Sequence, residues 1–511
     1  MTSSQTLREP AEPPATAPEH ITSERFDRRA WALLLVVCGA VFLDGLDISM
    51  VGVALPSIDA DLSLSTTSLQ WIVSGYVLGY GGFLLLGGRA ADLLGRRRVF
   101  IAALVLFATA SLLGGLVNDG TVLIATRFLK GIAAAFTAPA ALSIVTTTFA
   151  EGPARNRALA IYAATGATGF SSGLIFGGAL TELGWRLTFF VPVILTAGLI
   201  ALAIKYVPNH PSDDRAGRTM DLPGAALVTS TMLLAVFTIV QAPEAGWGSI
   251  RTIGSLFAVV VLGWAFLQVE HRTSHPLVRL GIFRSPRLRR ANLTAMTVFG
   301  AWIAFQFVGT LYMQQLRGWS AFEMAGAFLP TGLLVAFGSP QSGKLVGRYG
   351  SGPVIASGMV AFVAAYLLAT GISADSNYFT SFLPTMILGG LGFMLTFGPL
   401  NMAATEGIAD EEQGLASGLL FTSLQFGGAV ALAIATAAMA GATAGSSAPV
   451  GSVEATMDGF HAALVVSVVV SIAGLVIASS GLIAPALERR GWRTAPTTQD
   501  ERGLVATEDH R

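Results

Sequence analysis

Long apolar stretches separated by short polar connections make up most of this chain. An apolar run of about 20 residues can cross the hydrocarbon core of a bilayer as a helix, which satisfies its own backbone hydrogen bonds there. The pattern therefore predicts fourteen membrane-spanning helices. They are expected at residues 31–55, 67–89, 98–117, 121–149, 158–181, 187–207, 222–242, 250–269, 291–313, 323–343, 353–372, 378–403, 414–441 and 459–483.

Basic residues are unevenly distributed over the connections. Every second connection carries a cluster, whereas the others contain only Arg186, Arg251 or Arg317. The clusters are Arg25/Arg28/Arg29, Arg96/Arg97/Arg98, Arg155/Arg157, Lys205/Arg215/Arg218, Arg272 to Arg290, Lys344/Arg348 and Arg489/Arg490/Arg493. Because cytoplasmic loops carry an excess of lysine and arginine, the alternation predicts that both termini are cytoplasmic. An odd number of spans would break the alternation, so fourteen spans are favoured over thirteen.

The order of the predicted spans divides the chain into six, two and six helices. We expect a disordered cytoplasmic tail at 1–24, a six-helix half at 25–207, a linker with two extra transmembrane helices at 208–290, a second six-helix half at 291–483, and a cytoplasmic tail at 484–511. A simple spacer is the interpretation adopted for the two extra helices.

A short sequence echo links the two halves. GGRAADLLGRRR (87–98) and GKLVGRYG (343–350) each follow the second span of a half, and both place glycine and arginine at a short turn. They favour two parallel six-helix repeats, an architecture known among transporters. Two unrelated glycine-rich turns are the alternative.

The composition is typical of an all-α integral membrane protein. Of 511 residues, 53% are hydrophobic and 12% are charged, against ~25% charged in soluble domains. The chain lacks a phosphate-binding P-loop, a metal-ligand spacing and a Ser/His/Asp arrangement. We therefore expect no enzyme activity, no cofactor and no metal. We expect the basic loop at 271–290 to face lipid headgroups or solvent, and we expect no nucleic acid as a partner. We expect a monomer in the lipid bilayer.

Four charged residues lie deep inside predicted spans. Asp44 and Asp47 are three residues apart in the first span, and Arg127 and Lys130 are three apart in the fourth, so each pair shares a helical face. A carboxylate in the hydrocarbon core costs at least ~2.5 kcal/mol, and two cations in one span need acids or water nearby. These residues are therefore functional candidates.

The loop after the second span is the most specific local motif. Gly88 and Gly95 permit close helix approach and a tight turn. Asp92 lies between them and can cap the next helix or pair with a basic residue in one conformation. The basic residues of this loop are Arg89, Arg96 and Arg97. Anchoring by positive charge is the alternative, and it explains the arginines but not Asp92 and the glycines.

This loop carries a family resemblance. GRAADLLGRRR resembles the loop signature of the major facilitator superfamily, Gly-x-Leu-Ala-Asp-x-x-Gly-Arg-Arg/Lys, with Ala90 where leucine is usual. LDISMVGVALP (46–56) is similar to the first-span motif of the fourteen-span drug:proton antiporters, in which Asp47 takes the place of the motif acid. Ser49 stands for the usual threonine and Gly52 for the usual asparagine. Asp44 lies outside the motif.

Three further stretches resemble the same family, so that the likeness covers residues 31 to 483. They are ATRFLKGIAAA (125–135), LYMQQLRGWSAFEMAGAFLP (311–330) and EEQGLASGLLFTSLQFGGAVA (411–431). The resemblance implies a major facilitator fold with two six-helix halves and two extra helices. It also implies secondary active, proton-coupled export of a small-molecule substrate by alternating access, in a bacterial plasma membrane. The expected substrates are hydrophobic or cationic drugs and antibiotic-like compounds.

Two positions depart from the family pattern. The fifth-span motif Gly-Pro-x-x-Gly-Gly reads GLIFGG here (173–178), with Leu174 in place of the proline, so no proline kink follows. The glycines retained for close helix packing are Gly169, Gly173, Gly177 and Gly178. Lys130 stands where glutamine is common in the family.

The intramembrane charges suggest a coupling mechanism. In the superfamily fold, spans one and four both line the N-terminal half of the central cavity. Burial disfavours the charged form of a carboxyl group and a nearby cation favours it. We therefore hypothesise that Asp47 loads and releases a proton as its distance to Arg127 or Lys130 changes. A static buried salt-bridge set that fixes packing is the alternative for Asp47, and even more so for Asp44.

The candidate substrate residues are polar amides and aromatic side chains. Gln306, Gln314, Asn401 and Gln425 lie in or beside C-terminal spans, and Trp302 and Phe305 offer an aromatic wall for an apolar or cationic substrate. Amides also join neighbouring helices at ~0.6 kcal/mol each, and aromatic residues more often pack in the core. For any single residue these structural roles compete with substrate binding.

Two other functions stay open. The missing proline leaves room for an uptake symporter of the same fold. A membrane sensor or receptor on a transporter scaffold is the alternative from another class, although it would need a larger cytoplasmic domain than these tails provide.

Overall fold

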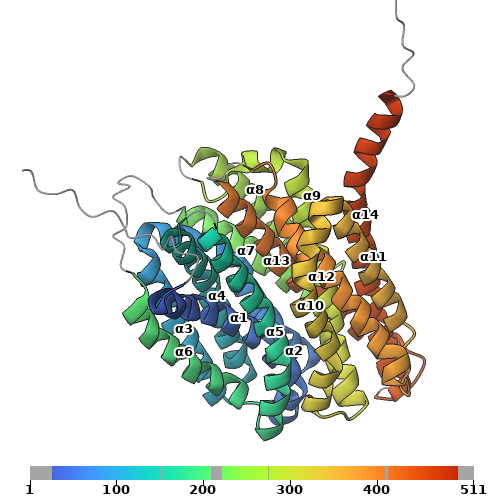
Figure 1. Ribbon diagram of the computed structural model, residues 1–511. Helices are drawn as coiled ribbons and strands as arrows, with labels where there is room; N and C mark the ends of the chain where they lie inside the picture. The colour runs from blue at the N-terminus through green and yellow to red at the C-terminus, as the bar shows by residue number, and fades with distance from the viewer. Residues whose placement is uncertain are drawn as a thin grey trace, which may run out of the picture.

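The computed structural model describes residues 26–150, 153–208, 221–273, 276–408, 412–449 and 451–492, which form a bundle of long helices (Figure 1). The long helices of this part are α1 (Arg28–Leu62), α2 (Thr66–Leu94), α3 (Arg96–Leu116), α4 (Gly120–Thr148), α5 (Pro153–Leu183), α6 (Leu187–Tyr206), α7 (Leu222–Ala245), α8 (Ile250–Arg272), α9 (Pro286–Leu311), α10 (Ala321–Tyr349), α11 (Ser351–Ala369), α12 (Leu383–Thr405), α13 (Gln413–Gly445) and α14 (Val453–Trp492). A 3-10 turn, η1 (Leu280–Arg284), precedes α9, and two π-helical turns, η2 (Tyr312–Leu316) and η3 (Tyr378–Phe382), follow α9 and precede α12.

Each predicted span corresponds to one long helix, and several helices, α1 and α14 most of all, extend beyond the predicted bounds. Thirteen helices are long and apolar enough to cross a membrane by length and composition, and α5 is the fourteenth long helix of the described chain. Polar residues of the short connections start many helices. Ser65 and Asp119 accept hydrogen bonds from backbone N–H groups of α2 and α4, and Ser320 forms a capping box with Glu323 at α10. The predicted all-α fold is confirmed.

The chain ends differ in part from the prediction. α14 continues through Trp492, so the segment after residue 484, expected as a tail, begins as helix. Hydropathy marks only the part of a helix that lies in the hydrocarbon core, and a helix extends into polar flanks without that signal. The predicted tail at 1–24 and the last residues, 493–511, lie outside the described residues.

The two halves repeat one packing scheme. In the N-terminal half α1 packs on α5, α2 on α4 and α3 on α6, and in the C-terminal half the same pairs recur as α9 on α13, α10 on α12 and α11 on α14. The turns after α2 and α10 are also equivalent, because Gly95 and Gly350 have φ of 95° and 84°. Such positive φ angles favour glycine. The parallel repeat predicted from the sequence echo is confirmed.

Two seams join the halves, one between α5 and α10 and one between α2 and α13. Glycines of α5 permit close approach on both sides of that helix. A Cβ atom on Gly177 would come within 2.8 Å of Met50 Cα in α1, and one on Gly178 within 2.8 Å of Phe322 Cα in α10. Gly169 and Gly173 lie equally close to the α1 backbone. Leu174, in place of the family proline, is buried inside the uninterrupted helix α5.

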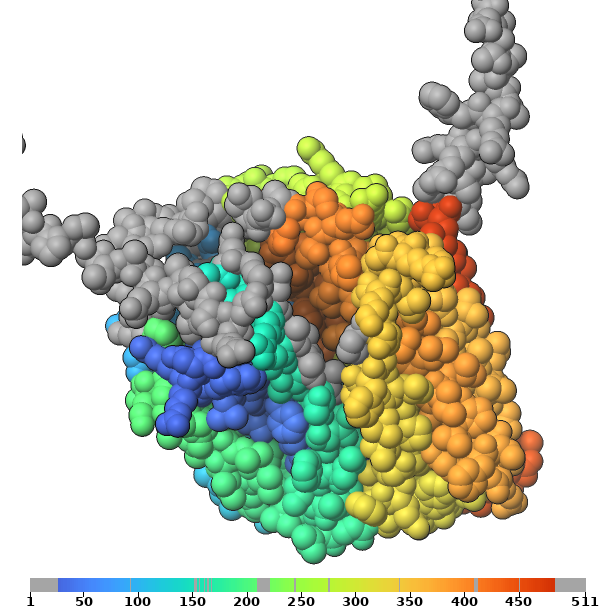
Figure 2. Space-filling model, viewed as in Figure 1, coloured from blue at the N-terminus to red at the C-terminus, as the bar shows by residue number. Residues whose placement is uncertain are grey.

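The halves touch closely near the end of the molecule where α1 terminates at Leu62. There Gln314 donates a hydrogen bond to the Val53 carbonyl oxygen (2.8 Å), and Gln315 donates one to the Asp59 carboxylate (3.1 Å). The Phe322 N–H also donates to Glu182 across the α5–α10 seam (3.4 Å). Figure 2 shows a hollow between the halves above this contact region, backed by α13 in orange. The molecule is therefore closed at the Leu62 end and hollowed toward the other.

The two extra helices have different surroundings. α7 packs along both α2 and α13, and Thr229 of α7 donates a hydrogen bond to the Gly82 carbonyl oxygen of α2 (2.8 Å). α8 packs on α7 and leaves large apolar side chains exposed, among them Ile250, Phe257 and Trp264. α7 thus covers the α2–α13 seam, whereas α8 presents an apolar outer face.

Candidate functional site

A fully buried ion-pair cluster in the N-terminal half brings together three of the predicted charged residues. The two carboxylate oxygens of Asp47 on α1 are each paired with one cation of α4, Oδ2 with Arg127 Nη1 and Oδ1 with Lys130 Nζ. The side chains of Asp47 and Lys130 are completely excluded from solvent, and that of Arg127 nearly so. Three buried charges in contact are costly to desolvate, and the mutual attraction and added hydrogen bonds must offset that cost.

Neighbouring helices complete the coordination of the two cations. Arg127 donates to the Ile72 carbonyl oxygen of α2 (3.2 Å) and lies 4.6 Å from the centre of the Tyr76 ring. Lys130 donates to Ser111 Oγ of α3 (2.9 Å), which in turn donates to the Phe189 carbonyl oxygen of α6 (2.8 Å). Fixed donors, acceptors and ring faces around buried cations keep them in one geometry.

Asp44 lies outside this cluster although it is one turn away on α1. Its side chain is buried, with the residue 5% exposed, and its Oδ2 atom has no hydrogen-bond partner. The Tyr76 hydroxyl is also buried without a partner. The two acids that share a helical face in the sequence therefore have different partners in the structure. Both carboxylate oxygens of Asp47 pair with cations, whereas the Oδ2 atom of Asp44 has no partner.

The ammonium group of Lys130 lies on the α3 and α6 side of the cluster. Lys130 faces the rings of Phe107 (4.7 Å from ring centre) on α3 and Phe189 (5.1 Å) on α6, not the hollow between the halves. In Figure 1, α3 and α6 lie on the side of the N-terminal half away from the C-terminal half. Proton exchange at Asp47 through a changing distance to Arg127 or Lys130 stays a prediction. The long apolar stem of Lys130 reaches past α1 into the bundle, where Asp47 and Ser111 satisfy its ammonium group.

The loop at 88–97 forms the predicted turn. Gly88 and Arg89 belong to the last turns of α2, Gly95 makes the connection, and Arg96 begins α3. Arg97 donates a hydrogen bond to the Ile204 carbonyl oxygen of α6 (2.5 Å), which ties the loop to the outer helix of the same half. The side chain of Asp92 lies outside the described residues, so its role as a latch stays a prediction.

The predicted substrate amides do not gather in one place. Gln306 of α9 lies beside Gly52 of α1, and its Nε2 atom is 3.2 Å from the point where a Cβ atom on Gly52 would lie. Gln314 donates its hydrogen bond to Val53, the residue after Gly52. Gln425 of α13 packs on Gly81 of α2. Asn401 donates to the Phe397 carbonyl oxygen of its own helix (3.0 Å). The three glutamines therefore contact the N-terminal half, whereas Asn401 bonds within its own helix.

Trp302 and Phe305 belong to a buried aromatic cluster of the C-terminal half. The Trp302 ring lies 5.0 Å from Phe393, 6.1 Å from Phe328 and 6.5 Å from Phe170 of α5, between ring centres. The indole N–H of Trp302 is buried without a hydrogen-bond partner. The sequence did not predict that Phe170 and Phe328 contact Trp302, because aromatic residues are common in apolar spans and no local pattern marks the ones that pack together.

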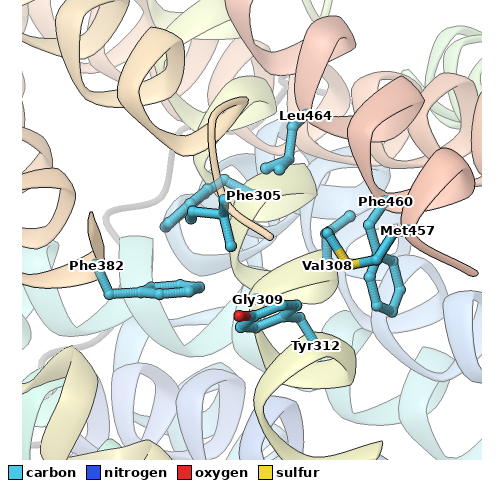
Figure 3. Close-up of a pocket in the computed structure, with 9 residues that line it drawn as sticks. Phe305, Val308, Gly309, Tyr312, Phe382, Met457, Phe460 and Leu464 are labelled. Atoms are coloured by element: carbon cyan, nitrogen blue, oxygen red, sulfur yellow. The ribbon is translucent and has the colours of Figure 1, made fainter. Parts of the chain in front are cut away.

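A small apolar pocket lies inside the C-terminal half (Figure 3). Its wall comes from α9, η2, η3 and α14 and includes Phe305, Tyr312, Phe382 and Phe460. The void measures about 10 Å³, close to the least volume that holds one water molecule. It is therefore a packing gap and too small for a substrate.

Several polar residues near the charges were also missed. Ser111, Tyr76, Tyr80 and Tyr162 surround the charged residues of α1 and α4, and single polar residues in apolar spans carry no signal of their own. No group of three or more His, Cys, Asp or Glu side chains that could hold a metal occurs within the described ranges. Cys38 is buried with a free thiol.

Comparisons with known proteins agree with this architecture. The family model of the Major Facilitator Superfamily matches residues 37–432. The chain is 36% identical over 465 residues to the puromycin resistance protein pur8 of Streptomyces alboniger, covering 88% of this chain and 91% of that protein. It is 36% identical over 427 residues to the cephamycin export protein CmcT of Amycolatopsis lactamdurans, covering 83% and 88%. A solved structure of the POT family transporter PepTSo has a TM-score of 0.64 at 16% identity, covering 90% of this chain and 99% of that one.

The helix pairs of the two halves, the glycine turns and the family match thus define one class of protein. The chain belongs to the major facilitator superfamily of membrane transporters.

Proposed function

We propose that this protein exports hydrophobic or cationic antibiotic-like compounds from a bacterial cell in exchange for protons, by alternating access. The observation that carries the proposal is the buried cluster of Asp47, Arg127 and Lys130 inside a membrane-spanning bundle, with Asp44 buried one turn away on α1. Ionisable groups in this position are costly and mark proton or ion pathways. The names of the relatives, puromycin resistance and cephamycin export, support export of antibiotic-like compounds.

The proposed orientation follows from the basic clusters. They put the Leu62 end outside the cell and both termini in the cytoplasm, in the bacterial plasma membrane. The inter-half hydrogen bonds of Gln314 and Gln315 then close the outer side, and the hollow opens to the cytoplasm. A substrate enters from the inside in this state, and breaking those contacts opens the outer side.

The proposal includes no resident cofactor, no enzyme activity and no nucleic acid partner. Protons are the coupling ion, the other partners are the small-molecule substrate and the lipid bilayer, and the working unit is a monomer. The two extra helices α7 and α8 are part of this unit.

The test is drug susceptibility and dye efflux in a host that lacks its own exporters. Cells with the gene are expected to tolerate higher antibiotic concentrations and to lose a preloaded cationic dye faster than cells with empty vector. An uncoupler is expected to abolish the difference. Efflux that ignores the uncoupler would contradict proton coupling, and dye accumulation above the empty-vector level would favour an uptake symporter instead.

A further inference from the structure

The two acids of α1 differ in the partners of their carboxylate oxygen atoms. Both carboxylate oxygens of Asp47 are held in ion pairs with cations of α4. Asp44 is buried to a similar degree, yet its Oδ2 atom is without a partner. A buried carboxylate that lacks a hydrogen-bond donor is costly, and taking up a proton removes the charge. Asp44 is therefore the carboxyl group of α1 that can exchange a proton without breaking an ion pair.

The groups around Asp44 come from its own helix and from three neighbouring helices, α2, α4 and α5. Asp47 of its own helix and Lys130 of α4 are charged groups near its carboxylate. The phenols of Tyr76 and Tyr80 on α2 and of Tyr162 on α5 are the titratable neighbours from those helices. The Tyr162 hydroxyl donates to the Ala138 carbonyl oxygen (3.0 Å). The charged residues of α5, α6, α9 and α10, which also pack on α1, lie near their helix ends.

Charge balance favours proton exchange at Asp44. The four charged side chains sum to zero when both acids are ionised, with two positive and two negative charges. A proton on Asp44 leaves Asp47 between the two cations. A proton on Asp47 would instead leave Arg127 and Lys130 side by side without the carboxylate that separates them, which is the more costly arrangement in a dry interior.

The helices around the two acids also differ in what they contact. The partners of Asp47 come from α4, with α3 and α6 behind it, and these helices pack on helices of their own half. The phenols beside Asp44 come from α2 and α5, which form the two seams with α13 and α10. A movement of the C-terminal half is therefore passed directly to the two helices that carry the phenols beside Asp44, whereas both cations of Asp47 lie on α4, which packs within its own half.

We propose that Asp44 is the carboxyl group that binds and releases the coupling proton, and that Asp47 is a positioning residue that holds Arg127 and Lys130. The inference rests on the proposed proton-driven export and assigns its proton site. In the outward-open state the Asp44 carboxylate takes one proton from the external solution and becomes a carboxylic acid. In the inward-open state the same O–H bond breaks and the proton leaves to the cytoplasm, so that no other reactant is needed.

The experiment uses the full chain reconstituted in liposomes with a cationic dye as substrate. Asp44→Asn is expected to lose dye accumulation driven by a pH gradient, and its dye exchange at equal pH is expected to lose the pH dependence of the wild type. Asp44→Glu is expected to restore both in part. Asp61→Asn, which changes an exposed acid at the far end of α1, is the matched control and is expected to behave as the wild type.

A labelling measurement keeps the proposal testable if Asp44→Asn does not fold. A hydrophobic carbodiimide reacts with protonated carboxyl groups in apolar surroundings. Treatment of wild-type protein is expected to modify Asp44, less so as pH rises, with Asp47 unmodified in peptide mass spectra. Gradient-driven accumulation by Asp44→Asn, or modification at Asp47 instead, would overturn the assignment. A wild type that accumulates no dye in a pH gradient would refute the proposed function itself.

Discussion

The two halves of the molecule use the same helix pairs to bury different chemistry. The N-terminal half encloses four charged side chains, Asp44, Asp47, Arg127 and Lys130. Within the described residues of the C-terminal half, 291–408, 412–449 and 451–483, no charged side chain is buried. That half encloses an aromatic cluster around Trp302 instead.

The difference indicates a division of labour within one repeated fold. A cluster of buried charges responds strongly to a proton, because electrostatic energies are large where water is excluded. Aromatic rings offer broad apolar contact and cation–π attraction, which suit varied hydrophobic or cationic compounds. We therefore expect changes in the N-terminal half to alter energy coupling, and changes in the C-terminal half to alter the range of substrates.

The largest effect is expected from Asp47→Asn. This change leaves Arg127 and Lys130 buried without their carboxylate, and breaking a buried ion pair costs ~3–5 kcal/mol. We expect a much lower yield of folded protein and a lower unfolding temperature, measured by fluorescence-detected size exclusion after heating. Adding Lys130→Met to the variant removes one unpaired cation, and recovery of part of the stability is expected. Wild-type stability of Asp47→Asn alone would mean that the ion pairs do not hold this half together.

A smaller effect is expected from Gly173→Leu on α5. A Cβ atom there would come within 2.8 Å of Leu46 Cα in α1, and overpacking costs about 1–3 kcal/mol. The expected result is a lower unfolding temperature together with weaker proton-driven transport, because α1 carries both acids. Gly198→Leu on α6 is the matched control, since nothing lies near its Cβ position. Equal effects of the two variants would show that close packing of α5 on α1 is not required.

A selective effect is expected from Trp302→Phe in the C-terminal half. The ring remains aromatic but the unpartnered indole N–H is lost. A hydrogen bond to a substrate contributes about 1 kcal/mol, or roughly fivefold in affinity. We expect the KM of transport to rise for substrates with hydrogen-bond acceptors, while uncoupler sensitivity stays as in the wild type. A loss of proton coupling with unchanged KM values would contradict the division between the halves.

The smallest effect is expected where the halves touch. Gln314→Met removes the hydrogen bond to the Val53 carbonyl oxygen. A hydrogen bond between membrane helices contributes ~0.6 kcal/mol, which corresponds to about a threefold shift of population. Distances between spin labels at the Leu62 ends of α3 and α11, in a Cys38→Ala background, are expected to show more of the outward-open state. An unchanged distance distribution would mean that this contact does not help to close the outer side.

Much of the fold and one part of the site could be predicted from the sequence. Span positions follow from length and hydropathy because a membrane leaves few other options for the backbone. The pairing of Asp47 with Arg127 and Lys130 was also accessible, since intramembrane charges need partners and these residues share two helices.

The remaining features depend on how helices rotate and meet. Asp44 and Asp47 share a face by spacing, yet only the structure shows that Asp47 is paired with α4 and that the Oδ2 atom of Asp44 has no partner. Gly52 stands where the related motif has asparagine, and the amide beside that position is Gln306 from the other half. Such contacts join residues far apart in the chain, and neither partner carries a local signal of the meeting.

The position of α7 makes the two seams of the transporter unequal. α7 lies against α2 and α13, with Val236 and Val240 buried against Tyr76 and Ala429. In the part of the chain that the structure describes, no long helix covers the α5–α10 seam in the same way. The α2–α13 seam is therefore covered on its outer side, whereas the α5–α10 seam depends on close packing at glycines such as Gly178. The helix pair that extends the twelve-helix plan thus makes the two sides of the molecule unequal in how firmly the halves are held together.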